Sequence, residues 1–74
     1  MVNTVILNDI EYMIIDAINM DGSLYAILIN VNDEKDFCFK KIIVKDGKEY
    51  FNGLSSREEF EKVLIKFTEK MIEN

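Results

Sequence analysis

Apolar and polar residues follow two different periods along this chain, and the period changes after Gly53. Before Gly53, runs rich in Val, Ile, Leu, Phe and Tyr are separated by short turn sequences, which is typical of antiparallel strands. After Gly53, apolar residues recur at intervals of three and four, which is typical of an amphipathic helix. The pattern predicts an α+β fold: an antiparallel meander sheet of four to five strands, followed by one C-terminal amphipathic helix packed on one face.

The turns between the predicted strands have a clear chemistry. Asp21-Gly22 and Asp46-Gly47 each lie between apolar runs, and Asp-Gly in that setting is the strongest local sequence feature of a tight hairpin. Asn8-Asp9 is a turn pair of a similar kind. The expected strands are residues 4–7, 10–18, 24–31, 37–45 and 48–51, with a polar loop over residues 32–36.

The predicted helix covers residues 57–72. A capping box precedes it, formed by Ser55 with Glu58 or by Ser56 with Glu59. One apolar stripe runs along it, made of Phe60, Val63, Leu64, Phe67 and Met71.

The strands are more apolar than one covering helix requires. A helix of about 17 residues is about 26 Å long and about 10 Å wide, whereas five strands spaced about 4.8 Å apart span about 19 Å. Such a helix covers about half of one face, yet residues 10–18 are apolar at odd and even positions alike. We therefore expect a second apolar contact surface, unless sheet twist, lysine stems and loops cover it. Its candidate residues are Met13, Ile15, Ala17, Ile65 and Ile72.

Charge is distributed unevenly along the 74 residues, which carry a net charge of −5. No Lys or Arg precedes Lys35, so the first part of the chain is wholly acidic. A negative protein is repelled by phosphates, so direct nucleic-acid binding is not expected. The acids could form one surface for a basic partner, and the candidates are Asp9, Glu11, Asp16, Asp21, Asp33 and Glu34.

Catalytic and metal chemistry have little support in the residues. The chain has no histidine, so the usual general base and the usual partner of a Ser or Cys nucleophile are missing. Cys38 is the only cysteine and lies between two phenylalanines, which is typical of a small buried hydrophobe. Oxygen-bearing side chains alternate from Asn30 to Asp36, but the glycine and the closing glutamate of a calcium loop are absent. We expect no enzyme activity, no metal and no cofactor.

Length and hydropathy indicate one small domain over residues 1–74. The longest apolar run, Leu24 to Ile29, is far shorter than the roughly 20 residues of a transmembrane helix. The first residues lack the basic stretch of a secretory signal. We expect a cytoplasmic protein that does not engage membranes.

A series of features in order resembles the small acidic bacterial YrzB-like family, a domain of unknown function. These are Glu11-Tyr12, the turn Asp21-Gly22, a strand led by Tyr25, a Phe-rich strand, the turn at residues 46–47 and the helix start at residues 58–60. The resemblance runs from about Ile10 onward and implies a bacterial domain with no catalytic residues to carry over. The abundance of Ile, Lys and Asn, with no Pro, His or Trp, separately favours an AT-rich genome, such as that of a low-GC bacterium or its phage. The chain departs from that family's acidic loops by placing Lys40, Lys41, Lys45 and Lys48 on the last hairpin.

Two functional hypotheses follow. The first is a non-enzymatic cytosolic interaction or accessory domain that uses an apolar sheet face to bind either another protein or a second copy of itself, as a homodimer. The alternative is an acidic phage-type inhibitor or nucleic-acid mimic that blocks a basic site on a host protein. The second hypothesis requires the six acids to share one surface and binding to weaken steeply with salt.

Overall fold

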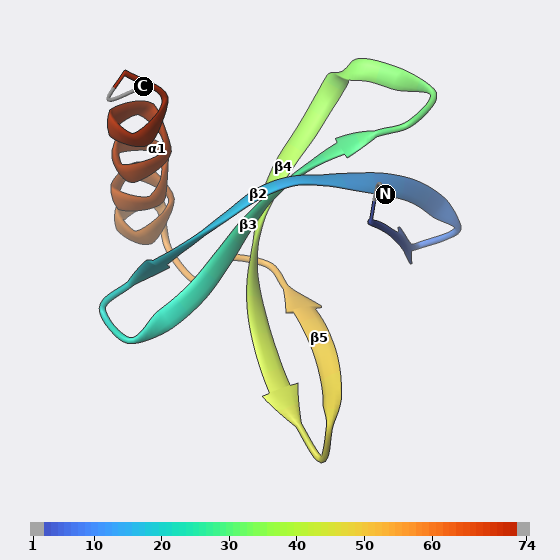
Figure 1. Ribbon diagram of the computed structural model, residues 1–74, viewed down its shortest axis with the longest axis horizontal. Helices are drawn as coiled ribbons and strands as arrows, with labels where there is room; N and C mark the ends of the chain where they lie inside the picture. Colours follow the sequence, from blue (N-terminus) through green and yellow to red (C-terminus); the bar gives the residue numbers. More distant parts are fainter. Residues whose placement is uncertain (1–2, 73–74) are drawn as a thin grey trace.

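The computed structural model describes residues 3–72 and shows five strands in a single antiparallel meander, followed by one helix (Figure 1). The predicted α+β architecture is confirmed. Each strand pairs only with its neighbours in sequence, in the order β1-β2-β3-β4-β5. The elements are β1 (Thr4–Leu7), β2 (Ile10–Met20), β3 (Ser23–Asn30), β4 (Asp33–Lys45), β5 (Lys48–Asn52) and α1 (Arg57–Ile72).

Three two-residue turns join the strands as predicted. Both central residues have positive φ at Asn8-Asp9, at Asp21-Gly22 and at Asp46-Gly47. This is the type I′ geometry whose twist matches that of the flanking strands. Asn, Asp and Gly tolerate the left-handed conformation, so the sequence fixes these hairpins locally.

The predicted polar loop over residues 32–36 is wrong, because β4 begins at Asp33. The ladder is irregular there: Ile29 pairs with Phe37 while Asn30 pairs with Asp33, so β4 carries extra residues. Side chains in this stretch bond one another, as in the 3.1 Å bond from Asn30 Nδ2 to Asp36 Oδ2. The polar composition was therefore a feature of a hairpin end rather than of a loop.

A β-bulge in β2 decides which side chains share a face. Ile14 pairs with Leu28 and Asp16 with Ile27, so Ile15 is the unpaired extra residue. Because side chains alternate between faces, one extra residue reverses the orientation of everything beyond it. The prediction that Met13, Ile15 and Ala17 point the same way is thus wrong for Ala17, which lies on the face opposite to Met13.

The main core lies between α1 and one face of the sheet. It is formed by the buried residues Met20, Tyr25, Phe39, Val63 and Phe67, with Ile18, Ile27 and Leu54 packed against them. Phe67 stacks on Phe39 with ring centroids 5.5 Å apart, which fixes the helix over β4. The hydrophobic stripe predicted for the helix is confirmed at its two buried positions, Val63 and Phe67.

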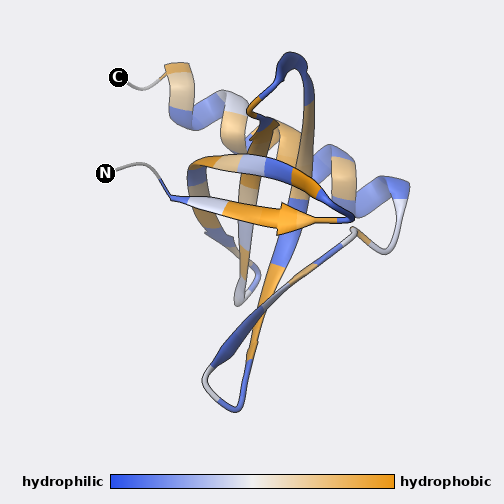
Figure 2. Ribbon diagram, turned by 90° about the vertical axis from the view of Figure 1, so that its right-hand side faces the viewer, coloured by the Kyte–Doolittle hydropathy of each residue, from blue (hydrophilic) through white to orange (hydrophobic). Residues whose placement is uncertain are grey.

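The face without the helix is covered by the sheet itself. Ala26 and Leu28 lie on that face and are 0% exposed. The strongly twisted sheet curls so that β1 lies on the side away from the helix (Figure 2). The central part of this face is therefore not the free apolar surface that the strand pattern predicted.

Candidate functional site

Glu59 anchors the start of the helix to the sheet. Its backbone N–H donates to Ser56 Oγ at 3.1 Å, so Ser56 is the helix N-cap. Of the two predicted capping boxes, the Ser56–Glu59 pair forms this first bond, but its return bond goes to Ser55 instead of Ser56. The Glu59 carboxylate accepts bonds from the backbone N–H and hydroxyl of Ser55 at 2.7 and 3.0 Å. It also accepts one from the Tyr25 hydroxyl at 2.6 Å and lies 3.9 Å from the Lys41 ammonium.

These contacts hold Glu59 and Tyr25 in fixed protonation states. The Tyr25 hydroxyl, together with Ser55, lowers the pKa of Glu59 below its ordinary value of 4.5. The same bond and burial raise the pKa of Tyr25 above its ordinary 10.0. At neutral pH the pair is therefore a carboxylate and a phenol, joined by a hydrogen bond that links the helix to β3.

A second anchor holds the end of the helix. Lys70 Nζ donates to Asp16 Oδ1 at 2.8 Å and to the Ala17 carbonyl oxygen at 3.2 Å. The Lys70 bond, aided by the Ala17 N–H, lowers the pKa of Asp16 below 3.8. Asp16 follows the bulge at Ile15, so the bulge turns this carboxylate toward the helix. The helix is thus tied to β3 and β4 at its start and to β2 at its end.

One edge of α1 carries large apolar side chains that nothing covers. Phe60 and Leu64 are each 42% exposed and Met71 is 74% exposed. Beside them on β4 lies Phe37, 53% exposed, whose ring makes an edge contact with Phe39 at 6.1 Å. The ring centroid of Phe60 in turn lies 5.4 Å from that of Phe39. We call these four residues, Phe37, Phe60, Leu64 and Met71, the apolar shelf.

The apolar shelf is in contact with the hydrophobic core. Phe39 is buried and contacts both shelf phenylalanines. Half-buried Ile29 pairs with Phe37 across the sheet, and Met13 pairs with Ile29, so all three point to the helix side. A contiguous apolar surface bounded by polar residues is the usual mark of a protein-binding surface.

Comparisons with known proteins identify a family. No family model matches the chain, and no solved structure matches it. It is 37% identical over 68 residues to a UPF0473 protein of Pelotomaculum thermopropionicum, covering 85% of this chain and 75% of the relative. The chain belongs to the UPF0473 family. A second UPF0473 protein, of Heliobacterium modesticaldum, is 36% identical over 61 residues, which cover 76% of this chain and 65% of the relative.

Both UPF0473 relatives are bacterial, which agrees with the predicted bacterial domain of unknown function. Neither carries the YrzB name, so that finer resemblance stays a prediction. Their shared name states no activity, and the chain spans less than two thirds of the Heliobacterium relative. The function of this UPF0473 chain must therefore be inferred from its own residues.

The predicted interface residues do not form one surface. Met13 lies on the helix face and is half-buried, whereas Ala17 lies on the opposite face. Ile15 is exposed at the bulge. Ile65 and Ile72 are exposed on the side of the helix turned away from the sheet. Sequence reasoning assigned Phe60, Leu64 and Met71 to the core stripe, and its candidates did not include Phe37.

The six predicted acids are also divided. Asp9, Glu11, Asp33 and Glu34 lie at one end of the sheet, where the Val31 N–H donates to the Glu11 carbonyl oxygen at 3.1 Å. Asp21 lies in a turn at the opposite end, and the charge of Asp16 is offset by Lys70. The single acidic surface required by the inhibitor hypothesis does not form.

The candidate metal ligands and the cysteine show no sign of a reactive site. Asn30 Oδ1 accepts the Asn32 N–H at 2.9 Å, and no metal-binding group of acids and cysteine occurs in this part of the chain. Burial raises the pKa of the Cys38 thiol, so less of it is thiolate at neutral pH than in a free cysteine. No helix among the described residues is long and apolar enough to cross a membrane.

Proposed function

We propose that this UPF0473 chain is a non-enzymatic protein-interaction domain, acting in the cytoplasm as an accessory factor, and that it binds its partner through the apolar shelf. The observation that carries the proposal is the exposure of four large side chains along one edge of α1 and on the neighbouring β4, namely Phe37, Phe60, Leu64 and Met71. Aromatic residues and methionine are enriched in the centres of protein interfaces. Their burial by a partner removes apolar area from water, which favours association.

The shelf is supported by rigid elements, which suits a binding role. Both ends of α1 are tied to the sheet, by Glu59 and by Lys70. Phe60 and Phe37 rest on the buried Phe39 ring. Side chains that are already ordered lose less conformational entropy on binding, so less of the contact energy is offset.

The absence of catalysis is part of the proposal. The sequence has no histidine, and Ser55 and Ser56 bond Glu59 at the helix start. The pKa of Glu59 is lowered, whereas a carboxylic acid catalyst at neutral pH needs a raised one. A surface hollow beside Glu59 is lined mostly by polar residues. Every buried side-chain N or O in residues 3–72 has a hydrogen-bond partner.

The test places a photo-crosslinking amino acid at Leu64, on the shelf, in cells that produce the chain. The control places it at Ile65, also exposed but on the other side of the helix. We expect a discrete adduct from Leu64, none from Ile65, and loss of the adduct when Met71→Glu is added. Equal labelling at both positions, or no adduct at Leu64, would contradict the proposal.

A further inference from the structure

Asn52-Gly53 is the only place in this sequence where glycine follows asparagine. In such a pair the backbone nitrogen of the glycine can attack the side-chain amide carbon of the asparagine, because glycine has no Cβ to obstruct the approach. The new N–Cγ bond closes a succinimide ring. The bond from Cγ to the side-chain nitrogen breaks, and that nitrogen leaves as ammonia with the proton of the glycine N–H. Water then opens the ring at either carbonyl, which gives aspartate or isoaspartate.

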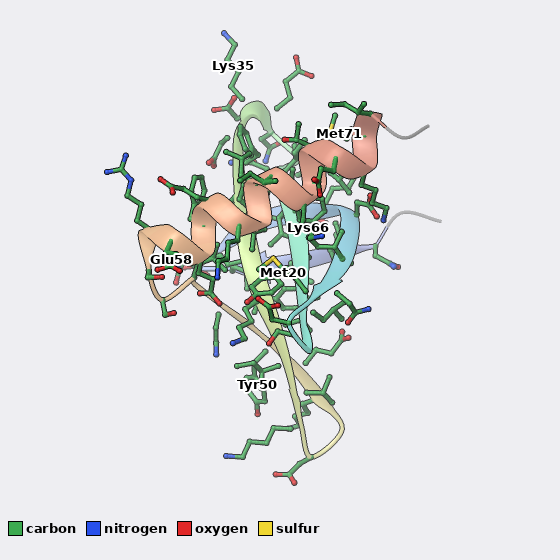
Figure 3. All side chains as sticks on the ribbon, turned by 90° about the vertical axis from the view of Figure 1, so that its left-hand side faces the viewer. Met20, Lys35, Tyr50, Glu58, Lys66 and Met71 are labelled. Atoms are coloured by element: carbon green, nitrogen blue, oxygen red, sulfur yellow. The ribbon has the colours of Figure 1, made fainter. Side chains whose placement is uncertain are left out.

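Both residues of this pair are open to solvent in the folded chain. Asn52 and Gly53 are exposed, and beyond the neighbours in sequence no atom lies within 4 Å of the position that a Cβ on Gly53 would take. Asn52 borders a surface hollow together with Ile43 and Tyr50. Figure 3 shows Tyr50, two residues before Asn52, on the part of the β4–β5 hairpin that extends beyond the helix. Water and base can therefore reach the reacting atoms.

The backbone at this pair is held on one side only. Asn52 is the last residue of the edge strand β5 and pairs with Lys41, where the ladder ends. Among the described residues, the Gly53 N–H donates to no backbone carbonyl. Ring closure requires rotation about the Cα–C bond of Asn52, which disturbs the terminal pair of the ladder and no other. The ends of edge strands open at lower free-energy cost than the interior of a sheet.

The two Asp-Gly pairs differ from Asn52-Gly53 in chemistry and in restraint. Aspartate is ionised at neutral pH, and a carboxylate is a poorer target than an amide for the backbone nitrogen. Asp21 and Asp46 also lie in turns that are closed by paired strands on both sides. Rotation there would open a hairpin rather than the end of a strand, so the reaction is expected to be confined to Asn52.

We infer that Asn52 deamidates spontaneously in the folded chain, through a succinimide formed with Gly53. This modification site is separate from the apolar shelf and does not rest on the proposed binding function. The product adds one negative charge to a chain whose net charge is −5. The new carboxylate lies opposite Lys41, whose ammonium is 3.9 Å from Glu59 at the helix start. Isoaspartate also lengthens the backbone between β5 and α1, so the modification acts where the helix is joined to the sheet.

Mass spectrometry of purified wild type, aged at neutral and mildly alkaline pH in water enriched in heavy oxygen, tests the inference. Trypsin, used afterwards in ordinary water, yields residues 49–57, which contain Asn52 alone, and residues 1–35, which contain five other asparagines. Heavy oxygen in the new acid marks deamidation that occurred before digestion. We expect residues 49–57 to react at least about tenfold faster than residues 1–35. The rate should rise with pH, because the deprotonated nitrogen is the nucleophile, and isoaspartyl methyltransferase should methylate the product.

Gly53→Ala is the matched variant, because it adds a Cβ beside the reacting nitrogen where the structure has open space. It should slow the reaction at least about tenfold with an unchanged circular dichroism spectrum. Glu49→Ala alters an exposed residue of the same tryptic fragment and should react like wild type. Wild type unfolded in urea gives the rate without the fold, and the folded rate should lie within about tenfold of it.

Three results would overturn the inference. The first is a folded chain that keeps the Asn52 amide while the urea-unfolded chain loses it, because the fold would then protect this residue. The second is an equal rate in Gly53→Ala, and the third is a product without isoaspartate. The last two would each mean that no succinimide forms with Gly53.

Discussion

The Tyr25 hydroxyl donates a 2.6 Å hydrogen bond to Glu59 Oε2, joining the first half of β3 to the first turn of the helix. The two residues are 34 positions apart in sequence, and the bond fixes where the helix starts on the sheet. Tyr25 also belongs to the buried core, so its ring and its hydroxyl serve different purposes. The ring packs under the helix, and the hydroxyl orients the capping glutamate.

This bond predicts that acid destabilises the protein. The pKa of Glu59 is lower in the folded chain than its ordinary 4.5, so the folded state favours the carboxylate. The stabilisation is present above pH 4.5 and is lost as the pH falls through the folded-state pKa. We expect the urea midpoint of wild type to fall in this range and that of Tyr25→Phe to fall less. Asp16 titrates in both proteins and serves as the internal control; identical pH profiles would contradict the prediction.

Leu28 tests whether the sheet covers its own second face. Leu28→Ala should destabilise the fold by about 3 kcal/mol, the usual cost of a cavity at a fully buried leucine. A domain of this size has a total stability of only about 3–5 kcal/mol, so the variant should be largely unfolded at room temperature. Val44→Ala on the same face is the control, because Val44 is largely exposed. Urea unfolding would refute self-coverage if both variants lost equally little stability.

The bulge at Ile15 predicts a contrast between deletion and substitution. Deleting Ile15 makes β2 regular and forces one half of the strand to present its side chains to the wrong face. We expect this deletion to abolish cooperative unfolding. Ile15→Thr keeps the extra residue at a partly exposed position and should change stability by no more than about 0.5 kcal/mol. A deletion variant that unfolds like wild type would show that the register can adjust.

Gly47, in the turn between β4 and β5, and Gly53, just after β5, give a matched pair of glycine substitutions. Gly47 has a φ of +77°, so Gly47→Ala places a Cβ in the left-handed region at a cost of about 1–2 kcal/mol. Gly53 lies outside that region with open space around it, so Gly53→Ala should be neutral or stabilise by up to about 1 kcal/mol. Chemical denaturation of both variants measures the difference. Equal effects of the two substitutions would contradict the prediction that the left-handed conformation at Gly47 restricts its side chain.

Local chemistry made much of the fold predictable. The three type I′ turns require residues that accept positive φ, and Asn8-Asp9 and the two Asp-Gly pairs met this requirement in the sequence itself. The helix bounds followed from Ser56 and from the spacing of Val63 and Phe67. These features depend on neighbours in sequence, which a single chain displays directly.

The site was less predictable because it depends on tertiary packing. Periodicity alone gave no indication that Ile15 is a bulge residue, so Met13 and Ala17 were placed on one face. Phe60, Leu64 and Met71 belong to the same helical stripe as Val63 and Phe67. Only the position of the helix on the sheet decides which of them are buried. The exposure of Phe37 likewise depends on how far the helix reaches across β4.

The strictly sequential strand order has a consequence for how the protein is made. Every strand pairs with strands next to it in sequence, and topologies with such local contacts fold quickly. The meander can therefore form as its strands leave the ribosome, while α1 is synthesised after all five strands. Until the helix docks, Tyr25 and Phe39 lie uncovered on a complete sheet, and exposed surfaces of this kind are prone to aggregation. The interval between completion of β5 and docking of α1 is thus when a nascent chain is most vulnerable.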